Sequence, residues 1–295
     1  MPHQSYRRSI LYTMKIYKLQ NQALLLTEKG AFLSPELKSW AELINRSDLY
    51  QYLESMSEQW TPAGDDFLAE QDRFDPPVDS YQEVWAAGVT YLRSKEARME
   101  ESEQSGGDRF YDLVYDAPRP ELFFKAIGHR VKGHGSEIGI RSDSPWNVPE
   151  PELTLFMTSK QEIVAYTIGN DVSSRSIEGE NPLYLPQAKM YDSSAAVGPC
   201  LYIPKEPISP DTIIDIRILR NEDVMYKDSI RIDQMKRTHK ELVSYLFRSH
   251  TFEEGVFLMT GTCLIPENDF TLKEKDRVEI SITGIGTLIN QVKTV

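Results

Sequence analysis

Short apolar segments, separated by glycine, proline and polar residues, dominate the chain after residue 82. Each is four to eight residues long, which suits a β-strand, because helices of globular proteins commonly need about ten residues or more. The segments expected to be strands are 83–89, 137–140, 153–157, 163–168, 212–219, 255–259 and 278–282. The larger part of the chain is therefore predicted to be mainly β.

Two helices are predicted to interrupt these strands. The first follows Tyr91. The second begins after Thr238, because Thr238 and Glu241 stand three residues apart, as in a capping box, ahead of the apolar residues Leu242 and Leu246. The chain is thus expected to belong to the α+β class.

Two consecutive prolines, Pro76 and Pro77, divide the chain, because proline lacks a backbone donor and restricts the residue before it. Ahead of this break we expect a strand pair and then helices, with Ser34 as an N-cap before Pro35 at the first helical position. Apolar residues then recur at helical spacing: Leu49, Tyr52, Leu53, Met56 and Trp60. We predict a disordered extension over residues 1–13, a small α+β N-terminal domain over 14–78 and a catalytic domain over 79–295.

Charge and cysteine content narrow the possible partners. The formal net charge is −12, which disfavours binding to a nucleic acid or an anionic membrane. The two cysteines, Cys200 and Cys263, are far apart, so neither a disulfide framework nor a cysteine zinc site is indicated. No run of about 18 apolar residues and no cleavable leader pattern is present. We therefore expect a cytoplasmic protein that attracts a small acid through local positive charge.

Glu150 and Glu152 form the most informative local pattern. In an extended chain, residues two apart project to the same side, so both carboxylates can bind one cation. Asp171 ends the next strand-like segment and can bring a third carboxylate to the same place. Oxygen ligands select hard cations, so Mg²⁺ is expected, with Mn²⁺ or Ca²⁺ as substitutes. The alternative is that the two glutamates are solvated at a strand edge.

The order and spacing of several short motifs resemble the fumarylacetoacetate hydrolase superfamily. These motifs lie at residues 149–153, 169–175, 189–192, 198–199 and 260–262. The resemblance implies a mixed β-roll catalytic domain in which Glu150, Glu152 and Asp171 bind Mg²⁺. It also implies a homo-oligomer, either a dimer or a tetramer.

Further segments are similar to the branch of this superfamily that dehydrates 2-keto-3-deoxy-D-arabonate. They are residues 119–125, 133–135, 141–144 and 180–187. The implied reaction is the magnesium-dependent loss of water from this 2-keto acid to give 2,5-dioxopentanoate, a step of pentose catabolism. A lyase of the hydro-lyase type is therefore expected.

One difference from the carbon–carbon hydrolases of the superfamily supports this expectation. Those enzymes carry a histidine and a glutamate that activate water. Aligned on Tyr91, this chain has Ser94 and Ala97 at those positions. A metal-dependent hydrolase of acylpyruvates or diketo acids remains the alternative, because Glu96 or Glu100 could replace the missing base. A sugar-acid binding protein without turnover is a third hypothesis.

The resemblance assigns provisional roles to further residues. Lys189 is expected to remove a proton from C3 of the substrate, a task that requires neutral lysine, which burial or a nearby cation favours. Glu121 is expected to protonate the departing C4 hydroxyl. Alternatively, Lys189 is a surface lysine or an anchor for a phosphate-like group, and Glu121 pairs with Arg119 or Lys125.

The remaining predictions concern substrate binding. The backbone amides and hydroxyls of a Thr-Gly-Thr turn suit a carboxylate, although such turns also occur for conformational reasons alone. The residues expected to contact the substrate are Thr260, Gly261, Thr262, Lys125, Tyr91 and Ser94.

Overall fold

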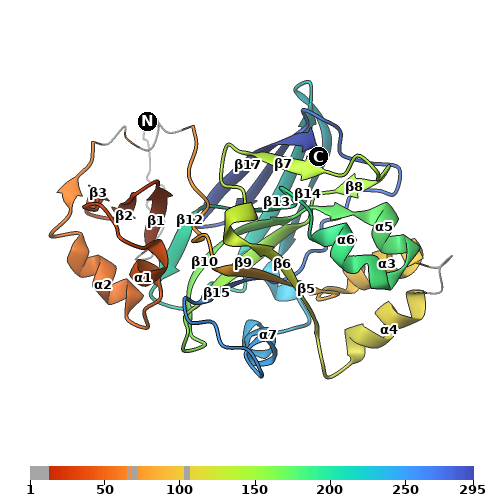
Figure 1. Cartoon of the computed structure of the whole chain (residues 1–295), viewed down its shortest axis with the longest axis horizontal. Helices are drawn as coiled ribbons and strands as arrows, with labels where there is room; N and C mark the ends of the chain where they lie inside the picture. The colour runs from red at the N-terminus through yellow and green to blue at the C-terminus, as the bar shows by residue number, and fades with distance from the viewer. Residues whose placement is uncertain (1–12, 65–66, 68–71, 103–106) are drawn as a thin grey trace, which may run out of the picture.

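The computed structural model describes residues 13–64, 67, 72–102 and 107–295. A long sheet runs through the molecule and joins the N-terminal strands to strands from the middle and later parts of the chain (Figure 1). Its strands are, in spatial order, β4 (Thr61–Pro62), β3 (Gly30–Leu33), β2 (Gln22–Thr27), β1 (Thr13–Leu19), β12 (Ala195–Pro204), β10 (Ile163–Asp171), β9 (Pro151–Met157), β15 (Val256–Met259), β5 (Glu83–Gly88) and β6 (Glu121–Ile127).

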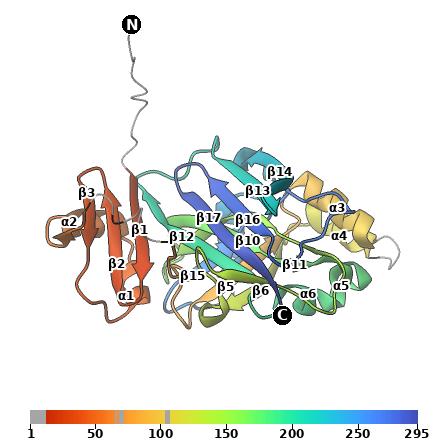
Figure 2. The same ribbon diagram turned by 90° about the horizontal axis from the view of Figure 1, so that it is seen from above.

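A second sheet packs on the first, with β16 and β17 against β10 and β12 (Figure 2). Its strands are, in spatial order, β14 (Asp223–Arg231), β13 (Ile213–Arg220), β16 (Arg277–Ile282), β17 (Gly286–Thr294) and β7 (Glu137–Ile140). A short pair joins β8 (Asn147–Val148) to β11 (Ser173–Ser174). Pairs β5–β15 and β7–β17 are parallel within otherwise antiparallel sheets. These mixed sheets with few helices confirm the predicted fold class.

One large apolar cluster lies between the two sheets. Alternate residues of β13, such as Ile214 and Ile216, are buried, while Asp215 is exposed. They pack in one cluster with Leu155 of β9 and Ile168 of β10. Each such side chain stabilises the fold by about 1.5–3 kcal/mol when it is removed from water. The core therefore holds β9 and β10 in a fixed position.

The N-terminal strands extend the main sheet, because β1 pairs antiparallel with β12. Helices α1 (Trp40–Ile44) and α2 (Leu49–Met56) cover this part of the sheet, at the left of Figure 1. Of the expected N-terminal extension, only Thr13, where β1 begins, lies among the described residues. The expected helix start at Ser34 is wrong, because α1 begins at Trp40.

Side-chain partners explain where these helices begin. Ser39 caps α1 by accepting a hydrogen bond from the amide of Glu42 at 3.1 Å. Ser34 instead accepts a hydrogen bond from the amide of Ala23 at 2.8 Å, which fixes it to β2. The predicted helix start at Thr238 is confirmed, since Thr238 accepts a hydrogen bond from the amide of Glu241 at 3.1 Å. The side chain of Glu241 accepts from Arg237 Nη1 at 2.7 Å, so only the Thr238 half of the expected capping box is formed.

The remaining helices lie at the opposite end of the molecule from α1 and α2 (Figure 1), apart from α7 (His239–Leu246), which begins after the Thr238 cap. The first of them, α3 (Leu92–Ser102), confirms the helix predicted after Tyr91. The others are α4 (Asp108–Asp116), α5 (Arg175–Glu180) and α6 (Leu185–Lys189). Among the described residues, no helix has the length and apolarity needed to span a membrane.

Candidate active site

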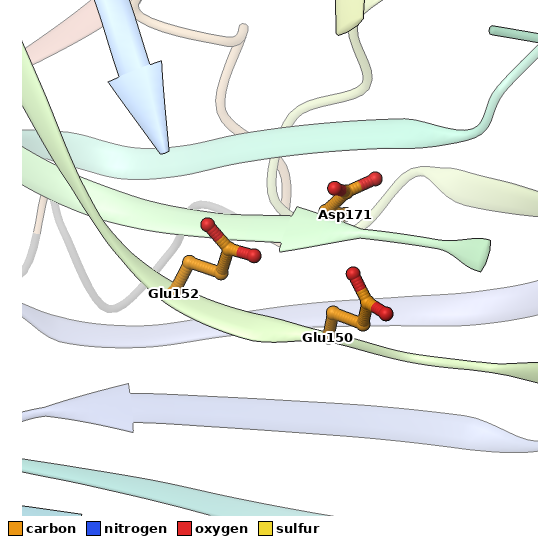
Figure 3. Close-up of side chains that lie close together, drawn as sticks. All are labelled: Glu150, Glu152 and Asp171. Atoms are coloured by element: carbon orange, nitrogen blue, oxygen red, sulfur yellow. The ribbon is translucent and has the colours of Figure 1, made fainter. Parts of the chain in front are cut away.

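Three carboxylates converge where β9 and β10 run side by side (Figure 3). Glu150 immediately precedes β9, Glu152 lies within it, and Asp171 ends β10. The amide of Asp171 donates to the carbonyl of Glu150 at 3.0 Å, which fixes the two backbones together. All three side chains are buried, and one oxygen of each lies within 4.8 Å of the others. The predicted convergence is confirmed, and the alternative of two solvated glutamates is wrong.

Four cationic side chains contact two of these carboxylates. Lys189 Nζ contacts Glu150 Oε2 and lies 3.3 Å from Asp171 Oδ2, and Lys125 forms an ion pair with Asp171. The other oxygen of Glu150, Oε1, lies 2.6 Å from Arg175 Nη2 and 3.4 Å from Arg98 Nη2.

These cations determine the ionisation of Glu150. Burial alone would raise the pKa of its carboxyl group, but the positive charges of Lys189, Arg175 and Arg98 lower the pKa to about 2. Glu150 is therefore a carboxylate at neutral pH and is available as an anionic ligand.

Glu152 has a different environment. Among the described residues it forms no ion pair, and it accepts a hydrogen bond from the amide of Gly261 at 2.6 Å. Burial, followed by the negative charges of Asp171 and Glu150, raises the pKa of Glu152 well above its ordinary value. A divalent cation would supply the missing positive charge, and all-oxygen ligands suit Mg²⁺. The residues present therefore fit a hard divalent cation.

The hydrogen bond to Glu152 requires glycine at position 261. Its φ of +98° lies in the region that favours glycine, and an added Cβ would lie 2.0 Å from Thr90 Oγ1. The predicted Thr-Gly-Thr turn therefore supplies its central amide to Glu152, and Thr260 Oγ1 donates to the carbonyl of Leu153 at 2.9 Å.

Lys189 and Lys125 pair with different oxygens of Asp171. Lys189 ends α6 and is fully buried, so the alternative of a surface lysine is wrong. The ammonium of Lys125 donates to the carbonyls of Val172 at 3.0 Å and Lys189 at 2.5 Å, besides its ion pair with Asp171. These bonds support a positioning role for Lys125, whose predicted contact with substrate remains a prediction.

Glu121 is half-buried at the start of β6. Its carboxylate lies against Gly88, where an added Cβ would be 2.0 Å from Glu121 Oε2. The alternative pairings are absent from the described residues, because Arg119 lies over the ring of Tyr245 and Lys125 pairs with Asp171. Burial raises the pKa of Glu121, although Arg98 and Lys189 oppose this effect. A carboxyl group with a raised pKa is suited to donate a proton.

A narrow cavity opens onto the three carboxylates. Of the predicted substrate contacts, Ser94 and Thr262 line it. Tyr91 is buried, and its carbonyl accepts a hydrogen bond from Ser94 Oγ at 2.7 Å. The cavity is also lined by Gly88, Phe123, Arg98, Arg175 and Lys189.

Sequence reasoning missed three charged residues of this site: Arg98, Arg175 and Glu178. Arg98 follows Ser94 by four residues, so both lie on the buried face of α3. Arg175 and Glu178, three residues apart on α5, are both buried. Helical spacing was the signal that could have found them. Glu96 and Glu100, the proposed replacement bases on α3, are exposed, so the structure gives them no place at the site.

Known proteins are similar to this chain in sequence and in fold. The fumarylacetoacetate (FAA) hydrolase C-terminal family matches residues 95–293. A probable 2-keto-3-deoxyxylonate dehydratase of Haloferax volcanii is 52% identical over 220 residues, covering 74% of each chain. The 2-dehydro-3-deoxy-D-arabinonate dehydratase of Saccharolobus solfataricus is 43% identical over 223 residues, covering 75% of this chain and 74% of its own.

A solved structure extends the similarity to nearly the whole chain. It is 2-keto-3-deoxy-D-arabinonate dehydratase complexed with magnesium and 2,5-dioxopentanoate. The two chains are 32% identical with a TM-score of 0.78, and the match covers 97% of this chain and 99% of the other. The chain described here belongs to the fumarylacetoacetate hydrolase family.

Proposed function

We propose that this protein is a magnesium-dependent dehydratase that converts 2-keto-3-deoxy-D-arabonate into 2,5-dioxopentanoate. The observation that carries the proposal is the buried cluster of Glu150, Glu152 and Asp171 with Lys189 in contact. The cluster lies in a chain that matches, over 97% of its length, a dehydratase structure holding magnesium and 2,5-dioxopentanoate.

The names of the two sequence relatives agree on one substrate class. Oxidation at C2 and loss of the hydroxyl at C3 leave C4 as the only stereocentre of a 2-keto-3-deoxy pentonate. Acids derived from arabinose and xylose of the same series are therefore the same compound. The relatives named after 2-keto-3-deoxyxylonate and 2-dehydro-3-deoxy-D-arabinonate thus support the same kind of substrate.

Glu150, Glu152 and Asp171 are assigned to the metal. A bound Mg²⁺ would polarise the 2-keto group and so make the C3 hydrogen more acidic. Lys189, which pairs with two of these carboxylates as an ammonium group, is assigned to remove the proton from C3. This task needs the neutral amine, which a divalent cation bound to the same carboxylates would favour.

Glu121 donates a proton to the C4 hydroxyl, which leaves as water, while the C3–H electron pair forms the C3–C4 double bond. Tautomerisation then moves one hydrogen from C5 and the hydrogen of the 5-hydroxyl group to C3 and C4, which gives the aldehyde of 2,5-dioxopentanoate. Ser94, Thr260, Thr262 and the amide of Gly261 are assigned to the surroundings of the substrate, with Tyr91 and Lys125 supporting them.

Hydrolysis of a carbon–carbon bond has no supporting observation in this site. Ser94 and Ala97 stand where the hydrolases have their histidine and glutamate, and Glu96 and Glu100 are exposed. The buried charged residue that α3 contributes is Arg98, which cannot act as a base because it stays protonated.

The cellular setting follows from the same proposal. A step of pentose catabolism on a small 2-keto acid belongs in the cytoplasm, and we assign the protein there as a homo-oligomer. Residues 14–78 are assigned to a small domain on the edge of the catalytic part, with the boundary at Pro76 and Pro77, between β4 and β5.

Turnover of 2-keto-3-deoxy-D-arabonate with Mg²⁺ tests the proposal. Any 2,5-dioxopentanoate is measured by coupling to an NADP-dependent semialdehyde dehydrogenase. We expect product formation that EDTA abolishes and that Glu152→Ala lacks, while the exposed Glu162→Ala behaves as the wild type. Pyruvate release from an acylpyruvate, without turnover of the pentonate, would show that the protein is a hydrolase instead.

A further inference from the structure

Arg98 connects two buried carboxylates in separate elements. Its Nη2 lies 3.4 Å from Glu150 Oε1, and its Nη1 forms an ion pair with Glu178 Oε1. Glu178, on α5, also accepts a hydrogen bond from Ser173 Oγ at 2.8 Å. A single guanidinium from α3 is therefore shared between Glu150, assigned to the metal, and Glu178, which lies outside the three-carboxylate cluster.

Glu150 is surrounded by positive charge. Arg175 and Lys189 contact it more closely than Arg98 does, so the contact with Arg98 is the longest of the three. A divalent cation that binds Glu150 comes within reach of these fixed charges, and repulsion between like charges is strong where water is excluded. Arg98 also pairs with a second carboxylate, Glu178, which lies outside the metal cluster.

We propose that Arg98 competes with the divalent cation for Glu150, and that Glu178 limits this competition by holding the guanidinium away. The inference rests on the proposed metal site and deepens it. Arg98 and Glu178 are positioning residues that set the affinity of the site for its metal, and neither touches the reacting atoms in this proposal.

The affinity of the full chain for Mn²⁺, measured by calorimetry in the absence of substrate, tests the inference. Arg98→Gln removes the competing charge, and we expect binding about tenfold tighter. Glu178→Gln leaves the guanidinium on Glu150, and we expect binding about tenfold weaker. Arg98→Lys keeps a positive charge and is expected to stay close to the wild type.

A double variant shows whether Glu178 acts by holding the Arg98 guanidinium or through the electrostatic effect of its own charge on the metal. If Glu178 acts by holding Arg98, then Glu178→Gln changes nothing in the Arg98→Gln background. Additive effects on the affinity would mean that Glu178 acts through its own charge, which would contradict the proposal that it holds Arg98 away from Glu150. Arg93→Gln, on the same helix and paired with Asp228 at 3.2 Å, is the matched control and should leave the affinity unchanged.

Two further results would overturn the inference. If Arg98 and Glu178 form only a structural pair, both single variants weaken Mn²⁺ binding and lower the unfolding temperature together. If the wild type binds Mn²⁺ and Arg98→Gln binds it equally, there is no competition. A wild-type protein that binds no Mn²⁺ at all would instead contradict the proposed metal-dependent function.

Discussion

The two ends of the strand pair β9–β10 are buried to the same degree by opposite means. At one end, Leu155 and Phe156 are apolar and completely buried. At the other end, Glu150, Glu152 and Asp171 are 1–2% exposed although their side chains end in carboxyl groups. The apolar end is stabilised by removal from water alone, whereas each buried charge needs a specific partner.

This difference explains how the site is assembled. The partners of the charged end come from α3, α5, α6 and β6, so several elements must be in place before the cluster is compensated. Burying paired charges adds little stability, while leaving one partner unpaired is costly. The apolar end thus provides a rigid support, and the charged end uses that rigidity to hold groups that would otherwise repel.

The largest effect is expected from Asp171→Ala. This change removes a metal ligand and leaves the buried ammonium groups of Lys125 and Lys189 without one of their partners. We expect turnover to be lost and the protein to be destabilised by about 3–5 kcal/mol. Urea unfolding and the coupled assay measure the two effects. Asp215→Ala, at an exposed position of β13, is the control, and a stable, active Asp171→Ala protein would contradict the assignment.

Lys189→Met tests the base at the charged end. Removal of a general base lowers kcat by about a thousandfold, while the carboxylates that bind the metal are retained. We therefore expect Mn²⁺ binding to persist in a protein that has lost turnover. The exposed Lys160→Met is the control. Equal loss of metal affinity and turnover would mean that Lys189 acts only on the carboxylates.

The apolar pattern was sufficient to predict most of the core strands. The predicted segment 137–140 coincides with β7 (Glu137–Ile140), and the segments for β9 and β10 differ only at their ends. Strands with an exposed or interrupted apolar pattern were missed. The edge strand β14 is mostly exposed, and β12 contains Gly198 and Pro199, a pair that normally indicates a turn.

The candidate site was predicted unevenly for a similar reason. Glu150 and Glu152 lie two residues apart in one extended segment, so their shared direction follows from local geometry. Their cationic partners come from segments far apart in sequence. Arg98 is 52 residues from Glu150, and only the fold brings the two together. Ser34 shows the same limit of local patterns, because the hydrogen bond that it accepts from the amide of Ala23 overrides the helix start that its neighbours predict.

Leu155→Ala tests the opposite end of the same strand. Removing a fully buried leucine side chain should destabilise the protein by about 3 kcal/mol, through lost burial and the cavity that remains. The activity per folded molecule and the Mn²⁺ affinity should stay unchanged, because no charged partner is altered. Urea unfolding and active-enzyme titration measure these quantities. A large change in metal affinity would show that the two ends are coupled through β9.

The smallest effect is expected from Glu121→Gln, and the pH dependence of kcat shows its cause. Burial raises the pKa of Glu121, which keeps the carboxyl group protonated to a higher pH than an exposed glutamate. A proton donor works only in this form, so the wild-type kcat should fall as pH rises through that pKa. The amide cannot donate in the same way, and we expect kcat to be lower by about a hundredfold and to lack this alkaline decline.

The control for this prediction is Glu83→Gln, which changes a carboxylate on β5, a strand paired with β6, without reaching the cavity. It should keep the wild-type profile. An unchanged alkaline decline in Glu121→Gln would assign the titrating group to another residue and remove Glu121 from the reaction. In that case, the charged end of β9–β10 would contain the whole proton-transfer machinery, with Lys189 as the group that both takes and returns the proton.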